Sequence, residues 1–394
     1  MTAGFPYPFA GYPEWMSKEL ENCGSPDRFQ VLNRGMGSWG SRREESLVRQ
    51  VLDESPWAVV LYMGHNEVGE EMLYRSVPAW ARSPIARWAW RSAGLTTLAR
   101  VVIREKERLS GAKEPQGAWG WPKFLIPLAP QEVESDFEAR LRRIVKTIAR
   151  SGAIPIICVS PSNLLLPPIR SNDADMSSAV SVRGASAEWI RTYASALDLW
   201  RRRRPESALA QLRTLPEAAR TDSVHWLTGM CLLELKQFER ARTELRLSAS
   251  KSWIASDRLR EIQRRVAREE GAVLVDLEKL WSNRSPAKLP EAKYFSDSHH
   301  LSLLGYRSAA RAILQALRES KRLPAQCPKP ERGERADIAD LGLPKKHEAA
   351  AWGLMANEYS FYGDQTGYAD FHRQAVEWMA RGLRLDPPGC QYEQ

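Results

Sequence analysis

The stretch Ala153-Ile154-Pro155-Ile156-Ile157-Cys158-Val159 is a short apolar run, and the polar turn Ser160-Pro161-Ser162-Asn163 follows it at once. A run of this length without a polar face is typical of a strand that is buried on both sides. Three further runs have the same character: Phe29 to Leu32, Trp57 to Met63 and Ala272 to Leu277. These four runs are the predicted strands.

Helical patterns lie between or after the predicted strands, at residues 41–53, 131–150, 256–270 and 303–317. Strands that alternate with helices indicate a parallel sheet covered on both faces. We therefore predict an α/β protein, a three-layer α/β/α sandwich around a parallel sheet, with further helical segments inserted and appended.

Polar segments follow three of the predicted strands, at residues 33–41, 64–67 and 160–163. Functional sites in parallel sheets gather at the carboxyl ends of the strands. These segments are therefore the first places to look for a site.

Near the end of the chain stands Asp297-Ser298-His299-His300-Leu301-Ser302, followed by Gly305-Tyr306. A serine nucleophile needs a base within hydrogen-bond reach and an acceptor that orients the base, and imidazole suits the base because its pKa lies near neutral pH. His300 and Asp297 could supply base and orienting group on one short loop. Two alternatives stay open: His299 is the base, or both histidines merely cap the helix.

The pattern Asp-x-x-His-Leu-Ser-x-x-Gly-Tyr resembles the last catalytic block of the SGNH (GDSL-type) serine hydrolases. The resemblance implies a flavodoxin-like sandwich and ester hydrolysis through an acyl-enzyme. It implies that His300 is the general base and that Asp297 orients it, with no metal and no organic cofactor.

Two other segments resemble the blocks that form the oxyanion hole of this family. Gly64-His65-Asn66-Glu67 is similar to its Gly-x-Asn-Asp block, which implies Asn66 as a side-chain donor, because an oxyanion requires N–H groups. In residues 33–41 the family's usual glycine falls on Ser38, beside Gly37, where a backbone N–H would serve. Asn163 and Gly64 are candidates for a substrate-contacting loop.

The nucleophile block of the family is Gly-Asp-Ser-x-x-x-Gly, and Met1-Thr2-Ala3-Gly4 reads as its tail. The resemblance therefore implies a serine just upstream of Met1, preceded by a strand in the middle of the sheet. Ser17, Ser38 and Ser41 do not stand in such a setting. The alternative is a catalytically dead hydrolase scaffold that serves as a repeat-mediated interaction module.

The expected organisation places the hydrolase core at 1–170 and 253–320. A Trp-rich insertion at about 70–130 forms either a small core of its own or a lid over the site. Residues 171–252 form a helical insertion with tetratricopeptide-like spacing, since Ala208 and Ala241 stand 33 positions apart. The same type of repeat is expected in the C-terminal part.

That C-terminal part, residues 321–394, begins with a linker rich in Pro and charge at 324–335. The repeat-like pattern after the linker consists of Ala375, Met379, Gly382 and Pro387. The expected partners are an ester substrate (a sugar, lipid or small acyl ester) and a protein that binds the helical repeats.

The composition narrows the class of protein. The net charge is +9 over 394 residues, but no nucleic-acid-binding motif accompanies it, so nucleic acid is not expected as a partner. Five scattered cysteines argue against a disulfide framework or a zinc site. No apolar run is long enough to span a bilayer. No signal peptide is visible; the compartment is unknown, with the cytoplasm as the default and export open if translation starts upstream.

Overall fold

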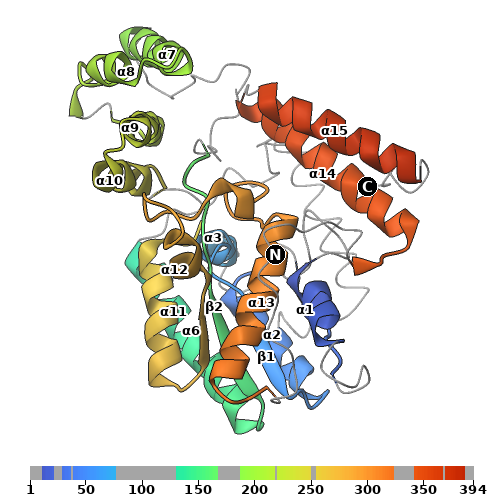
Figure 1. Ribbon diagram of the computed structural model, residues 1–394. Coiled ribbons are helices and arrows are strands. Elements are labelled where there is room, and N and C mark those ends of the chain that lie inside the picture. Colours follow the sequence, from blue (N-terminus) through green and yellow to red (C-terminus); the bar gives the residue numbers. More distant parts are fainter. Residues whose placement is uncertain are drawn as a thin grey trace, which may run out of the picture.

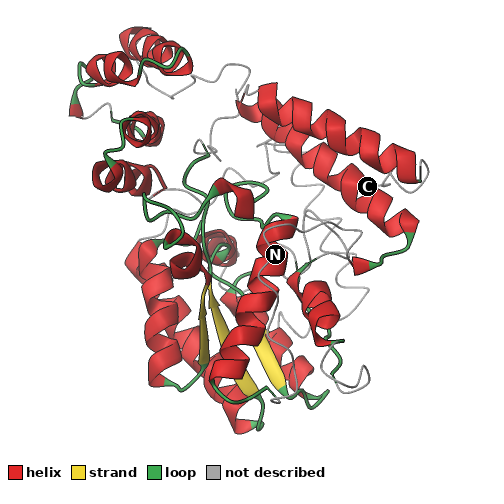
Figure 2. Ribbon diagram, in the orientation of Figure 1, coloured by secondary structure: helices red, strands yellow, loops and turns green. Residues whose placement is uncertain are grey.

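The computed structural model describes residues 11–21, 29–36, 39–76, 130–166, 187–217, 220–249, 254–323, 341–366 and 369–386. The protein is a mixed α/β structure in which helices predominate around one small sheet (Figure 2). The predicted mixture of helices with a parallel sheet is therefore confirmed.

The sheet has three parallel strands in the order β1-β2-β3. They are β1 (Ala58–Leu61), β2 (Ile154–Val159) and β3 (Val273–Asp276). In the ladders, Val60 stands opposite Ile156, and Ile157 stands opposite Leu274. Each strand lies within one of the predicted apolar runs, and all three carboxyl ends point to the same edge.

Helices pack on both faces of the sheet (Figure 1). Ile156 and Cys158 of β2 face a core shared with α1 (Tyr12–Leu20) and α13 (Leu303–Glu319). Ile157 faces the opposite core, which is shared with α2 (Ser41–Leu52), α6 (Pro130–Arg150) and α11 (Asp257–Glu269). Alternate residues of one strand therefore enter two separate cores, which explains why the run has no polar face.

The predicted strand at residues 29–32 is wrong. Residues 29–36 form neither strand nor helix, although Phe29 and Val31 pack against a core. A strand needs a neighbour for its backbone groups, and the only strand that pairs with β1 among the described residues is β2. Leu32 is nearly half exposed, at 47%, so apolar composition alone did not produce a buried strand here.

The region predicted as a helical insertion contains two antiparallel helix pairs, drawn in green shades in Figure 1. They are α7 (Ala187–Arg201) with α8 (Pro205–Leu212), and α9 (Asp222–Glu234) with α10 (Phe238–Ala249). A Cβ on Gly229 would meet the Leu245 side chain at 2.5 Å, so the glycine permits close helix packing.

The core between these four helices also contacts the loop after β2. Leu164 belongs to that core, and the indole of Trp226 donates a hydrogen bond to the carbonyl of Leu165, 3.1 Å away. The remaining short elements are α3 (Glu67–Ser76), α12 (Leu277–Ser282) and the 3-10 turn Ala292–Tyr294.

The C-terminal segment forms a further helical hairpin, α14 (Lys345–Thr366) and α15 (Ala369–Leu385), and Ala375, Met379 and Gly382 lie on α15. The Trp-rich segment from residue 77 to 129, the linker and Pro387 lie outside the described residues. Within the described part of the chain, no helix is both long enough and apolar enough to cross a membrane.

Candidate active site

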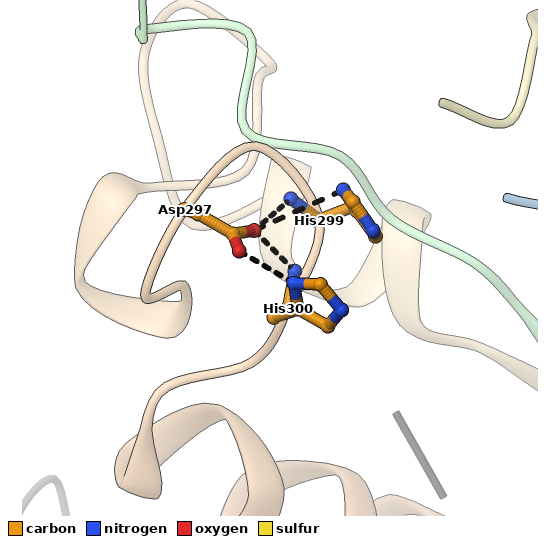
Figure 3. Close-up of side chains that lie close together, drawn as sticks. All are labelled: Asp297, His299 and His300. Carbon is orange, nitrogen blue, oxygen red and sulfur yellow. Dashed lines mark hydrogen bonds and ion pairs between the residues drawn. The ribbon is translucent and has the colours of Figure 1, made fainter. Parts of the chain in front are cut away.

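The loop that carries Asp297 and His300 is closed at its base by backbone pairing. Phe295 and Leu301 form an isolated antiparallel bridge, and the amide of Ser296 donates to the carbonyl of His300 at 2.8 Å. The loop lies between the 3-10 turn and α13. It presents the side chains of Asp297, His299 and His300 above this paired base (Figure 3).

The Ser and Gly that follow the loop have defined tasks. The Ser302 hydroxyl caps α13 by accepting a hydrogen bond from the amide of Gly305, 3.1 Å away. A Cβ at Gly305 would lie 2.1 Å from the carbonyl oxygen of Tyr294, so any larger residue would push the loop and the helix apart. In the spacing Leu-Ser-x-x-Gly, the Ser therefore caps the helix and the Gly allows the helix to approach the carbonyl of Tyr294 closely.

Asp297 is buried, with 1% of its surface exposed. Its Oδ1 accepts hydrogen bonds from the backbone amides of His299 at 2.7 Å and His300 at 2.6 Å. Its Oδ2 lies 2.5 Å from Nδ1 of His300 (Figure 3). An ionised carboxylate only accepts hydrogen bonds, so Nδ1 carries a proton and Nε2 of the neutral ring holds the basic lone pair.

The charge state of Asp297 follows from its neighbours. Burial by itself would raise the pKa of this carboxyl, but the charges of His300 and His299 and the hydrogen bonds from the two histidines outweigh burial and hold the pKa well below its usual value. The carboxylate is therefore ionised at neutral pH, as an orienting partner for a histidine must be.

The geometry separates the two candidate bases. Nδ1 of His299 lies 3.8 Å from the Asp297 carboxylate and 3.0 Å from the Ser298 hydroxyl, so it does not share the short bond of His300. Burial first, and then the charge of His300, lower the pKa of His299 to about 3. His299 is therefore neutral over the whole physiological range, and the Asp–His pair is Asp297 with His300.

The loops that follow β1 and β2 meet this pair. The backbone amide of Asn163 donates to the carbonyl of Ser298 at 2.8 Å, and its side-chain amide donates to the carbonyl of Asp297 at 3.3 Å. The ring of His65 lies against that of His299, with 5.0 Å between centroids. Segments 234 positions apart in the sequence thus converge at the carboxyl edge of the sheet.

Gly64 and Asn66 flank His65 in the turn after β1. Gly64 has a φ of 123°, a region that L side chains rarely adopt, so the turn requires glycine. The side-chain amide of Asn66 donates to the carbonyl of Trp39 at 3.0 Å, which joins the turn to the segment before α2. That bond uses one of the two N–H groups of the amide. Gly37 and Ser38 lie outside the described residues.

Two residues that the sequence did not single out anchor the loop after β2. The buried guanidinium of Arg260, on α11, donates to the carbonyl of Ser160 at 2.9 Å and to the hydroxyl of Ser162 at 2.7 Å. Gln263, one turn further along, accepts from the amide of Ser160 at 3.3 Å and also donates to the carbonyl of Met63, after β1, at 2.8 Å. The charged sequence of α11 resembles a solvated helix, so only the burial of these two side chains identifies them.

A second buried carboxylate, Glu67, lies at the start of α3. Its oxygens accept from the amide and the hydroxyl of Ser41, at 3.0 and 2.6 Å, and thereby cap α2. Burial, opposed by the bonds from Ser41 and reinforced by the charge of Glu70, raises the pKa of Glu67 to about 7. The hydroxyl of Ser41 in turn accepts from Arg140 at 2.9 Å.

Serine hydroxyls near the pair have other partners. Ser160 donates to the carbonyl of Met63, Ser162 accepts from Arg260, and Ser298 bonds to His299. Ser41 is bound to Glu67. None of these four hydroxyls forms the hydrogen bond to His300 that a serine nucleophile needs.

One group of metal-binding side chains occurs among the described residues: Asp297, His299 and His300, whose ligand atoms lie within 4.8 Å of one another. A cation held by all three would have to replace the bond between the Asp297 carboxylate and Nδ1 of His300. Both oxygens of Asp297 already accept hydrogen bonds, so the arrangement suits an Asp–His pair better than a metal centre.

Comparisons of the chain with protein-family models, with curated proteins and with solved structures found no match in any of the three.

Proposed function

We propose that this protein is a serine hydrolase of the SGNH type that cleaves ester bonds through an acyl-enzyme. The observation that carries the proposal is the buried Asp297, which holds Nδ1 of His300 at 2.5 Å and the loop amides at the same time. A carboxylate fixed in this way orients the imidazole and stabilises its protonated form, which is the requirement for a general base in acyl transfer.

In the proposed reaction, a serine oxygen attacks the acyl carbon while Nε2 of His300 takes the hydroxyl proton. The ester C–O bond then breaks, and His300 returns the proton to the leaving alcohol. Water attacks the acyl-enzyme in the same manner and releases the acid. Asn66 would donate to the oxyanion through its side-chain amide, together with a backbone N–H near Gly37 and Ser38.

The resemblance to the SGNH family assigns the serine to residues ahead of Met1, on a strand beside β1. Two observations support this source. The described hydroxyls of Ser160, Ser162 and Ser298 bond to groups other than His300. In addition, β1 pairs with one strand only among the described residues, and residues 29–32 beside it do not form the expected strand.

The test begins with the genomic DNA ahead of Met1, where the proposal expects an in-frame Gly-x-Ser. The protein extended by these residues, roughly one strand and one turn, should hydrolyse nitrophenyl acetate, and replacement of the new serine by Ala should abolish turnover. A folded, extended protein that contains the serine and cleaves no activated ester would contradict the proposal.

The helix pairs α7–α8 and α9–α10 favour a second role, the binding of a protein partner. They pack around a core of their own, which touches the rest of the molecule through Leu164, Ala287 and Leu289. Deletion of residues 171–252 should leave the cleavage of a small ester intact and abolish partner binding or narrow substrate choice. Loss of small-ester cleavage in a deletion that still folds would contradict this division of roles.

A further inference from the structure

His65 is a buried side chain, 3% exposed, in the turn that leads from β1 to α3. Its Nδ1 accepts a hydrogen bond from the backbone amide of Ala255, 3.0 Å away. Because that amide can only donate, Nδ1 must hold a lone pair, and the proton of the neutral ring must be on Nε2. The structure thus fixes one tautomer, with an N–H donor at Nε2.

This donor has no hydrogen-bond partner among the described residues, although the nitrogen is fully covered. A buried N–H without an acceptor is destabilising, so each such group in a native protein calls for an explanation, such as a catalytic role or a bound water or ion. The ring of His65 packs on His299, whose ring lies 4.1 Å from that of His300. The unsatisfied donor therefore belongs to the same group of rings as the proposed base.

We propose that Nε2–H of His65 donates a hydrogen bond to an oxygen of the bound acyl group, and that this bond strengthens as the oxygen becomes an oxyanion. This inference rests on the proposed function. A neutral imidazole suits the task because it donates without placing a second positive charge beside the protonated His300. Because Nε2 of His65 is covered, the proposal requires a neighbouring side chain to move when the ligand binds, and the ring packed on His65 is that of His299.

Two substitutions separate this role from a purely structural one. His65→Asn keeps an acceptor for the amide of Ala255 and removes the donor at Nε2. His65→Gln places an amide N–H near the position of Nε2 and removes the acceptor at Nδ1. In the extended enzyme, His65→Asn should lower kcat on nitrophenyl acetate by about 10²-fold, the usual loss for one oxyanion donor, and His65→Gln should lose clearly less. The reverse order would show that the bond to Ala255 matters and would overturn the proposal.

A second measurement does not depend on turnover. In protein labelled with ¹⁵N-histidine, the Nε2–H signal of His65 is identified by its loss in His65→Asn. Titration with methylphosphonate, a tetrahedral oxyanion, should move this signal in a saturable way. A signal that stays in place, as expected if a trapped water is the only partner, would overturn the proposal even if the enzyme is active. A signal that moves in a protein without esterase activity would support the donor and contradict only the proposed hydrolysis.

Discussion

Asp297 and Glu67 are both buried carboxylates near the carboxyl ends of the strands, and both accept hydrogen bonds from backbone amides. Asp297 lies in the loop before α13 and has two histidines as neighbours. Glu67 lies at the start of α3, caps α2 through Ser41, and has the carboxylate of Glu70 nearby. Burial alone would raise the pKa of both groups.

The neighbouring charges decide the outcome. The pKa of Asp297 falls well below its ordinary value, because the charges and hydrogen bonds of the two histidines outweigh the effect of burial. The pKa of Glu67 rises to about 7, because burial and the charge of Glu70 outweigh the bonds from Ser41. Two carboxylates whose pKa values are pushed apart have different tasks: Asp297 holds an imidazole, and Glu67 joins two helices.

The largest expected effect tests the Asp297 side of this comparison. His300→Ala in the extended enzyme removes the general base and should lower turnover of nitrophenyl acetate by at least ~10³-fold. The matched control is His299→Ala, which should cost far less, since His299 lies 3.8 Å from the carboxylate rather than in the short bond. An inactive His299→Ala beside an active His300→Ala would show that the other histidine is the base.

A smaller effect is expected for the oxyanion donor Asn66, which directly precedes Glu67 in the sequence. Asn66→Ala should lower kcat by about 10²- to 10³-fold, because one preorganised donor is lost. Asn66→Asp has nearly the same shape but carries a negative charge that repels an oxyanion, so it should be at least as slow. Thermal denaturation of both variants controls for the lost bond to Trp39. An Asn66→Asp enzyme of normal rate would remove Asn66 from the mechanism.

The fold could be predicted from the sequence where local pattern and tertiary surroundings agree. The runs at 57–63, 153–159 and 272–277 became strands because helices cover both faces of the sheet. The run at 29–32 has a similar composition but no partner strand among the described residues, and strand formation depends on such a neighbour. The apolar pattern of a run does not show whether a neighbouring strand is present to pair with it.

The site was predictable in part for a related reason. The Asp-x-x-His spacing predicted the pairing of Asp297 with His300, because the residues are close in sequence. His65, Arg260 and Glu67 were assigned no role from the sequence, because their burial depends on contacts more than 25 residues away in the chain. A histidine within the block after β1 was the available signal for His65, and nothing in the pattern distinguished Arg260 from the other arginines of α11.

The Glu67 side of the comparison can be tested by the pH dependence of stability. The folded-state pKa of Glu67, about 7, lies above the ordinary value of 4.5 for a glutamate, so the proton is bound more tightly in the folded protein. This contribution is fully present below the unfolded-state pKa and is lost as pH rises through about 7. It amounts to about 3 kcal/mol of unfolding free energy.

Glu67→Gln should therefore remove the fall in stability between about pH 4.5 and 7, as measured by urea denaturation at a series of pH values. Glu71→Gln is the matched control on the same helix. Burial raises the pKa of Glu71, but the bonds and charges of Arg42 and Arg75 lower it overall, so its contribution is lost on acidification instead. Identical pH profiles for Glu67→Gln and the unmodified protein would show that Glu67 is ionised throughout.

The smallest expected effect concerns the cap that holds the Asp297 loop against α13. Ser302→Ala removes the acceptor for the amide of Gly305 and should lower the free energy of unfolding by about 1 kcal/mol, the usual cost of a lost N-cap. Ser302→Thr keeps the acceptor for the amide of Gly305 and the hydroxyl that donates to the carbonyl of Lys293, so it should recover most of that stability. Because the backbone bridge between Phe295 and Leu301 persists, the bond from Asp297 to His300 should survive in both variants, and turnover in the extended enzyme should change by less than about 10-fold. A loss of turnover as large as that of His300→Ala would show that the cap, rather than the bridge and the bonds to Asp297, holds the catalytic loop in place.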